Sequence, residues 1–219
     1  MGYENDARWM VDRLADQFGA PPEEAENPVE TLVLTILSQN TTDVNRDRAY
    51  AALRKRFPSL TELADAPEPQ IADAIRPAGL QTQKAHAIRV ALRRILAERG
   101  TLDLEFLRSM TADAALAWLL DLPGVGHKTA GIVLLFSFSV PYFPVDTHIR
   151  RVLTRVGWLQ NRDDPHRRAN EILPHDPSMM RSLHLLLIHL GRTLCRPRNP
   201  LCSECPIAAH CTYGGGRFP

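Results

Sequence analysis

Lys128 is one of only three lysines among the 26 lysines and arginines of a chain of 219 residues. A lysine amine can lose its proton and attack carbon, whereas an arginine guanidinium stays protonated and is not a nucleophile. Lys128 follows a Gly-Val-Gly turn, so we expect it in the first turn of a helix. There the helix dipole and any burial would lower the pKa of its ammonium. These features favour a reactive amine; a surface lysine beside the turn is the alternative.

Asp146 is the first carboxylate after this lysine, and it stands between an apolar stretch and the helical spacing of Ile149, Val152 and Leu153. An aspartate at such a place is typical of a helix N-cap. A carboxylate beside an amine could also stabilise developing positive charge and assist proton transfer. The sequence supports both interpretations.

The four cysteines lie close together near the end of the chain, in CRPRNPLCSECPIAAHC, as Cys195, Cys202, Cys205 and Cys211. Thiols gathered in this way in an intracellular protein favour a metal centre over disulfides. Zinc sites usually pair two C-x2-C elements, and this segment has one. Four thiolates also suit an iron–sulfur cluster. Spacing alone leaves zinc and the cluster open.

Gly124 and Gly126 lie in the turn LPGVG, between two segments with helical apolar spacing. Glycine permits positive φ and lets another backbone approach closely. The first N–H groups of the following helix would then point outward and form a site for an anion such as phosphate. A glycine-rich helix connector is the alternative.

The elements that position these residues are predicted to be helices, because apolar residues recur at helical spacing and no alternating strand is convincing. Asn27-Pro28 and Ser59 are typical helix starts, and Gly100 is a typical helix end. We therefore predict an all-α chain of about ten short helices.

Charge and composition point to a soluble intracellular protein without a membrane span or signal peptide. The net charge is +1. Residues 1–145 carry 15 Lys and Arg against 19 Asp and Glu, and residues 146–219 carry 11 against 6. This asymmetry hints at an anionic partner, although a solvated charged surface would explain it equally well.

Taken together, these motifs resemble the endonuclease III family of DNA glycosylases, in the helix–hairpin–helix superfamily. The hairpin LPGVGHKTA, the segment VDTHIRRVLTR and the C-x6-C-x2-C-x5-C spacing each match a family motif. The segments ILSQNTTDVN and AGLQTQKAHAI resemble its two DNA-probing loops. The resemblance covers roughly residues 28–211 in the family's order.

The resemblance implies two helical domains that flank a DNA-binding cleft. Residues 28–140 would form a six-helix barrel that contains the helix–hairpin–helix. Residues 1–27 and 141–219 would form a discontinuous domain that holds a [4Fe–4S] cluster on the four cysteines. The partner would be double-stranded DNA with a damaged base or an abasic site, bound by a monomer in the cytoplasm, or at the nucleoid of a bacterium.

The activity implied by the resemblance is that of a bifunctional DNA glycosylase and AP lyase acting on oxidised pyrimidines. Lys128 would attack C1′ of the flipped nucleotide, Asp146 would stabilise the charge on the sugar, and β-elimination would cut the strand 3′ to the lesion. Other members of the superfamily carry serine or tyrosine at the lysine position.

The resemblance also implies residues that contact DNA. Asn40 would fill the gap left by the flipped base, and Leu80 would act as an apolar wedge. Gly124 and Gly126 would present backbone amides to phosphate. Two arginines in the loop between Cys195 and Cys202 would grip phosphates as well, namely Arg196 and Arg198.

Two departures from the family pattern bear on specificity. The first loop has Asn40 where glutamine would be one methylene longer, and Gln81 follows Leu80 where tyrosine is often found. The rival interpretations are a monofunctional glycosylase that activates water through Asp146 and a non-catalytic helical DNA-binding module stabilised by a metal.

Overall fold

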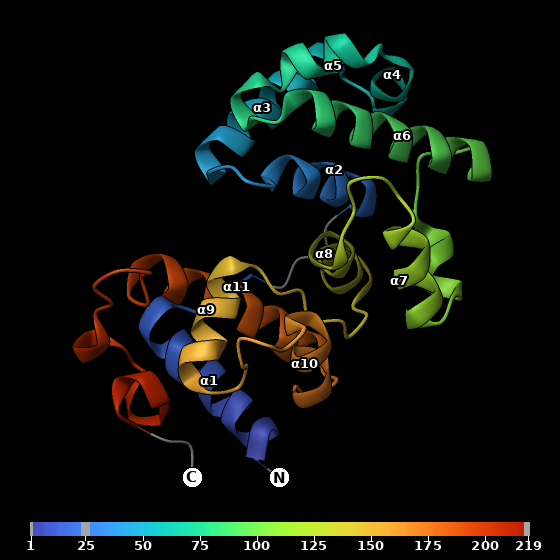
Figure 1. Cartoon of the computed structure of the whole chain (residues 1–219). Helices are drawn as coiled ribbons and strands as arrows, with labels where there is room; N and C mark the ends of the chain where they lie inside the picture. Colours follow the sequence, from blue (N-terminus) through green and yellow to red (C-terminus); the bar gives the residue numbers. More distant parts are fainter. Residues whose placement is uncertain (1, 23–26, 217–219) are drawn as a thin grey trace. The chain divides into compact units, whose positions relative to one another are not determined.

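The computed structural model describes residues 2–22 and 27–216. Within these ranges it contains α-helices and 3-10 helices and no β-strand (Figure 1), which confirms the all-α fold class. No helix in the described part of the chain is long and apolar enough to cross a membrane.

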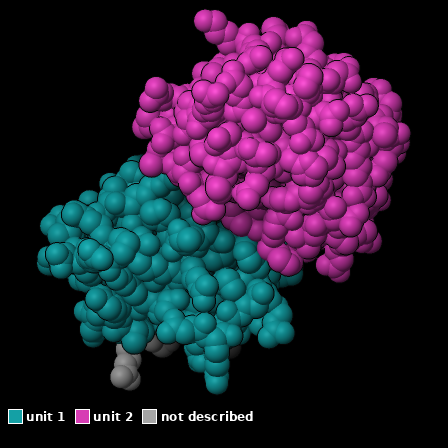
Figure 2. Space-filling view, turned by 45° about the horizontal axis from the view of Figure 1, so that its top comes forward, with its two compact units in different colours: residues 1–24, 139–219 teal, residues 25–138 magenta. Residues whose placement is uncertain are grey.

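The chain divides into two compact units, shown in different colours in Figure 2. Unit 1 is Met1–Glu24 together with Ser139–Pro219, and unit 2 is Ala25–Phe138. The sequence predicts a division at residues 28 and 140.

Unit 2 contains the predicted hairpin and both predicted probing loops. Its helices are α2 (Pro28–Ser38), α3 (Asp43–Arg56), α4 (Leu60–Asp65), α5 (Glu68–Ala74), η1 (Arg76–Ala78), α6 (Gln81–Arg99), η2 (Glu105–Ser109), α7 (Ala112–Leu120) and α8 (His127–Phe138). The predicted helix ends are confirmed: the Asn27 side chain caps α2, the Ser59 side chain caps α4, and Gly100 ends α6 with a φ of 74°.

Helix α2 is the centre of unit 2. It packs against α3, α6 and α8, and its apolar residues Leu32, Ile36 and Leu37 are fully buried. A helix that is apolar on most sides is stable only when other helices cover it. The loop that follows α2 therefore starts from a rigid core element.

Unit 1 is formed by the first helix and the carboxyl-terminal third of the chain. Its helices are α1 (Gly2–Phe18), α9 (Thr147–Val156), α10 (Pro165–Ile172), α11 (Pro177–Thr193), η3 (Cys202–Glu204), η4 (Ala208–His210) and η5 (Thr212–Gly214). Helix α11 packs against both α1 and α9 (Figure 1). The Trp9 ring of α1 stacks on the His210 ring at a centroid distance of 4.1 Å. The first helix is thereby tied to the cysteine segment.

Candidate functional site

The turn between α7 and α8 is fixed to the core by two apolar residues and contains two glycines. Leu122 and Val125 are buried, and the Val125 N–H donates to the Leu122 carbonyl at 3.1 Å. Gly124 has a φ of 74°, and a Cβ there would lie 2.9 Å from the Cβ of Ala87. Both the conformation and the packing therefore require glycine at position 124.

Gly126 differs from Gly124, because its φ is outside the left-handed region and nothing lies within 4 Å of an added Cβ. Of the two properties of glycine named above, positive φ is therefore used at Gly124, and the open space at Gly126 is compatible with close approach of another backbone. The structure leaves the surface over Gly126 open, at the amino-terminal end of α8, where backbone N–H groups lack intrahelical acceptors.

Lys128 is the second residue of α8 and is half-buried. Its Nζ lies 3.4 Å from the Ser38 Oγ, and the Ser38 hydroxyl donates its own proton to the Thr35 carbonyl at 2.7 Å. Because a hydroxyl has one proton and two lone pairs, Ser38 can accept a hydrogen bond from the amine. A neutral amine that donates one N–H in this way keeps its lone pair for attack on carbon.

The loop after α2 is bound to the hairpin by Gln39, a residue that sequence reasoning missed. Its Nε2 donates to the Gly124 carbonyl at 2.9 Å and to the Thr129 Oγ1 at 3.3 Å. The next residue, Asn40, is exposed and has a φ of 51°. Asparagine tolerates this left-handed conformation better than most residues. The loop is therefore held at Gln39 and presents Asn40 to solvent.

Leu80 is presented in a similar way at the start of α6. It is 49% exposed and has a φ of 49°, and the preceding Gly79 has a φ of 67°. A leucine in the left-handed region is strained, and its large apolar side chain stands in solvent. One surface hollow is lined by Gln39, Leu80 and Gly124, which belong to the two loops and the hairpin.

Lys84 is the second residue that sequence reasoning missed. It is 2% exposed, and its Nζ donates to the Leu37 carbonyl at 2.9 Å and to the Ala78 carbonyl at 2.8 Å. Burial lowers the pKa of this amine. An amine enclosed by two backbone carbonyls has no access to substrate, so Lys84 does not compete with Lys128 as a nucleophile.

Asp146 lies in unit 1, so its surroundings are those of α9. Its Oδ1 accepts a hydrogen bond from the Ile149 N–H at 2.7 Å, as an N-cap of α9. The expected cap is thus present, and it engages one of the two carboxylate oxygens. The cap fixes the direction of the half-buried carboxyl group at the amino-terminal end of the helix.

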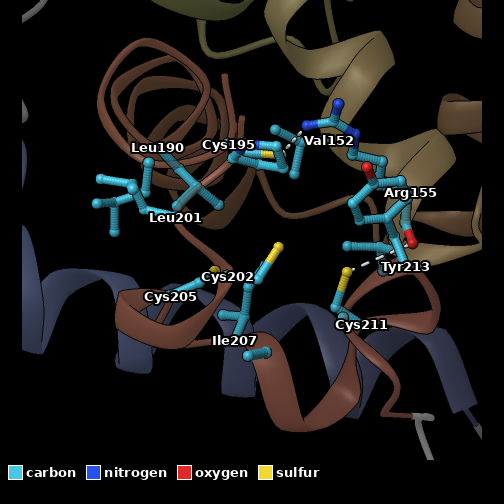
Figure 3. A pocket seen from close by; sticks show the side chains of 15 residues that line it. Val152, Arg155, Leu190, Cys195, Leu201, Cys202, Cys205, Ile207, Cys211 and Tyr213 are labelled. Atoms are coloured by element: carbon cyan, nitrogen blue, oxygen red, sulfur yellow. Dashed lines mark hydrogen bonds between the residues drawn. The ribbon is translucent and has the colours of Figure 1, made fainter. Parts of the chain in front are cut away.

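The four cysteines surround one cavity in unit 1 (Figure 3). The other walls of the cavity are largely apolar and include Val152, Leu190 and Leu194. A [4Fe–4S] cluster binds one thiolate at each of its four irons. The four thiols that line this cavity supply that number and kind of ligand, so the residues present fit the cluster.

Electrostatics in this cavity also fit a cofactor that binds thiolates. Burial, and to a smaller extent the neighbouring thiols of Cys195, Cys211 and Cys202, raise the pKa of the Cys205 thiol to about 11. Thiolates crowded together in an apolar cavity repel one another, and bound metal supplies the compensating positive charge.

Arg155 of α9 binds the cysteine segment at several points. Its Nη1 lies 3.3 Å from the Cys195 Sγ and donates to the Arg196 carbonyl at 2.7 Å, and its Nη2 donates to the Pro197 carbonyl at 3.1 Å. Its guanidinium lies over the Tyr213 ring (Figure 3). Sequence reasoning missed Arg155. The one signal in the sequence was its place on the amphipathic helix that Asp146 caps.

Arg196 and Arg198 are exposed, as expected of residues that grip phosphate. The Arg196 Nε donates to the Thr193 carbonyl at 2.8 Å, which orients its guanidinium. Unit 2 therefore contains Asn40, Leu80, Gly124, Gly126 and Lys128, and unit 1 contains Asp146 and the cysteine segment. Asp146 caps α9, and Arg155 of the same helix binds the cysteine segment.

Two protein-family models match the chain. Residues 33–174 match the HhH-GPD superfamily of base excision DNA repair proteins, and residues 195–211 match the iron–sulfur binding domain of endonuclease III. The endonuclease III of Thermotoga maritima is 35% identical over 189 residues, which cover 85% of this chain and 84% of the relative. A thymine-DNA glycosylase of Aeropyrum pernix is 32% identical over 195 residues, which cover 85% and 83%.

Solved structures of related proteins include complexes with DNA. A non-covalent endonuclease III–DNA complex is similar with a TM-score of 0.78 and 28% identity, covering 96% of each chain. A trapped endonuclease III–DNA covalent intermediate, an estranged-adenine complex, has a TM-score of 0.79, 28% identity and the same coverage.

Proposed function

Since the chain belongs to the endonuclease III family of base excision DNA repair proteins, and is thereby a DNA glycosylase that carries a [4Fe–4S] cluster, we propose that it removes oxidised pyrimidines from duplex DNA. We also propose that it is bifunctional and cleaves the strand 3′ to the lesion as an AP lyase. The observation that carries the proposal is the position of Lys128, whose amine lies 3.4 Å from the hydroxyl of Ser38, the last residue of α2, two residues before Asn40.

In the proposed reaction the lone pair of the Lys128 amine forms a bond to C1′ as the bond from C1′ to the base breaks. The base leaves with the bonding electrons and takes up a proton. The adduct then opens the sugar ring to a protonated Schiff base, which makes the C2′ proton acidic. Loss of that proton and departure of the 3′ phosphate complete the β-elimination. A covalent intermediate between a related endonuclease III and DNA supports this course.

Asp146 is proposed as the carboxylate that stabilises the positive charge on the sugar while the base departs. Its N-cap bond to Ile149 holds one oxygen in place, so the carboxylate needs little reorganisation during the reaction. The four cysteines are proposed as the ligands of the cluster. When bound, the cluster joins four thiolates and holds the segment around them together; the lysine chemistry draws no electrons from it.

DNA binding is proposed to combine backbone and side-chain contacts. The N–H groups at the start of α8 would hold phosphate over Gly126, and Arg196 and Arg198 would contact further phosphates. Leu80 would enter the base stack, and Asn40 would occupy the space of the flipped base. Their exposure and left-handed backbone support these roles.

A second candidate function is removal of mispaired thymine, which the 32% identity to a thymine-DNA glycosylase favours. Lys128 favours the first candidate, because an amine that forms a Schiff base explains strand cleavage. A panel of duplexes with single defined lesions, scored for base release and for nicking, separates the two.

The lysine itself is tested by reduction with borohydride during turnover, which should join protein and DNA covalently. Lys128→Gln should abolish this trapping while folding and DNA affinity persist, and Lys128→Arg should abolish it too, because guanidinium is not nucleophilic. Lys55→Gln, a change at an exposed lysine of α3, is the matched control and should trap normally. Undiminished trapping in Lys128→Gln would refute the assignment.

A further inference from the structure

A single buried ammonium joins the two loops that carry Asn40 and Leu80. The Lys84 Nζ donates to the Leu37 carbonyl and to the Ala78 carbonyl, and these acceptors belong to segments far apart in the sequence. Leu37 lies in the last turn of α2, and Ala78 is the last residue of η1. Carbonyl groups at helix ends lack intrahelical partners. One cation therefore satisfies two helix ends at once.

Each of these carbonyls lies within three residues of a residue held in a left-handed conformation. Leu37 precedes Asn40 by three residues, with a φ of 51° at Asn40, and Ala78 precedes Gly79 and Leu80, with φ values of 67° and 49°. A leucine in the left-handed region is strained, and such strain persists only where surrounding contacts enforce it.

Lys84 supplies such contacts on both sides of the leucine. Its backbone N–H donates to the Leu80 carbonyl at 3.0 Å, while its Nζ holds the Ala78 carbonyl at 2.8 Å. The strained pair Gly79-Leu80 is thus enclosed between two bonds from one residue.

We propose that Lys84 is a positioning residue that sets the Asn40 loop and the Leu80 loop as one unit, so that both probing side chains are in place before DNA binds. The consequence for DNA rests on the proposed function, whereas the coupling of the loops does not. Loops fixed in advance lose less conformational entropy when they enter distorted DNA, which favours lesion-containing over undamaged duplex.

The coupling is tested in the free protein by amide hydrogen exchange of residues 39–42 and 79–82. Lys84→Met keeps an unbranched apolar stem and removes the ammonium, so exchange should rise in both segments together. Lys84→Arg keeps several N–H donors and should restore protection in part. Lys55→Met is the matched control at an exposed lysine and should change neither segment. Unchanged exchange, or a rise in one segment alone, would overturn the proposal.

The consequence is tested by affinity for a duplex with a stable abasic-site analogue relative to undamaged duplex. The preference should fall roughly tenfold or more in Lys84→Met, the scale expected for misplaced positioning groups, while affinity for undamaged DNA stays the same. An equal loss for both duplexes would contradict positioning. If Lys84→Met does not fold, Lys84→Gln, which retains one donor group, takes its place in both assays.

The two arms separate the failure of this inference from failure of the proposed function. A wild-type protein without preference for any lesion would refute the proposed function, and the exchange experiment would still decide on the coupling. Loosened loops with an unchanged lesion preference would refute the positioning role alone.

Discussion

The hairpin region of unit 2 and the cysteine segment of unit 1 are held by different means. Around Lys128, the loops start from helices with buried inner faces, and backbone carbonyls are bound by Gln39 and Lys84. Between residues 195 and 216, which are all described, Ile207 is the only buried side chain. Burial of apolar surface is the main favourable term in folding, so the two regions differ in how far they can form unaided.

This difference indicates that the cluster contributes to the folding of the cysteine segment and not to that of the hairpin region. The hairpin region is built by the core and can hold its geometry before any partner arrives. The cysteine segment has little core of its own, and its contacts to α9 run mainly through Arg155 and Arg151. For such a segment the free energy of metal binding is also folding free energy.

Removing a thiol is the most direct test of the difference between the two regions. Cys205→Ser should cause loss of the cluster and unfolding of residues 195–216, because the remaining thiols cannot complete four ligands. Iron content, visible absorption and limited proteolysis measure this, with four irons per chain expected in the wild type. Ser203→Ala, at an exposed residue of the same segment, is the control and should keep the cluster.

Unit 2 should be unaffected by the same change. Hydrogen exchange of α8 should match the wild type in Cys205→Ser, since its contacts come from α2 and α7. A cysteine segment that stays protease-resistant without iron would contradict the comparison, and so would loosening of α8.

Asp146 tests whether a residue of unit 1 can keep its position without help from the cluster. It lies in the same unit as the cysteines, but its carboxylate is held by the cap of α9. Asp146→Asn should leave thermal stability nearly unchanged, since asparagine is an equally good N-cap. Base release should slow about a hundredfold or more, because the charge that stabilises the sugar cation is lost. Asp146→Ala should lose activity and also about 1 kcal/mol of stability.

A matched control for Asp146 is Asp164, which caps α10 by accepting from the Arg167 N–H at 2.8 Å. Asp164→Asn makes the same chemical change at the same kind of position and should leave base release intact. Equal loss of base release in both variants would show that the cap charge acts generally, and the role assigned to Asp146 would then be wrong.

Local features of the fold could be predicted from the sequence, and long-range contacts could not. Asn27, Ser59, Gly100 and Asp146 occupy their predicted cap positions, because a cap depends on residues within one turn. The all-α class followed in the same way from apolar spacing. The family and its cofactor followed from several motifs in a fixed order.

The missed residues act over long separations. Gln39 binds a carbonyl 85 residues away, Lys84 binds one 47 residues away, and Arg155 binds a sulfur 40 residues away. Each is an ordinary polar residue in its own segment, and no local rule marks its partner. Lys84 in particular lies in a segment of helical apolar spacing that does not mark it as buried, and only the folded structure shows that it is enclosed.

The smallest expected effects come from the two hairpin glycines, which separate what the core requires from what DNA requires. Gly124→Ala places a Cβ 2.9 Å from the Ala87 Cβ at a φ of 74°. It should cost about 1–2 kcal/mol of stability, measured by denaturant unfolding, because a residue with a Cβ is strained in the left-handed conformation. Gly126→Ala meets nothing within 4 Å and should unfold like the wild type.

DNA binding should reverse the order of the two variants once stability is accounted for. If phosphate approaches the amides over Gly126, the added methyl obstructs it and weakens binding to damaged and undamaged duplex alike, by about tenfold for the loss of one strong hydrogen bond. Fluorescence anisotropy at two salt concentrations measures this at a temperature where both variants are folded. Normal affinity of Gly126→Ala for both duplexes would remove phosphate from this turn and leave the glycine without a function that the structure explains.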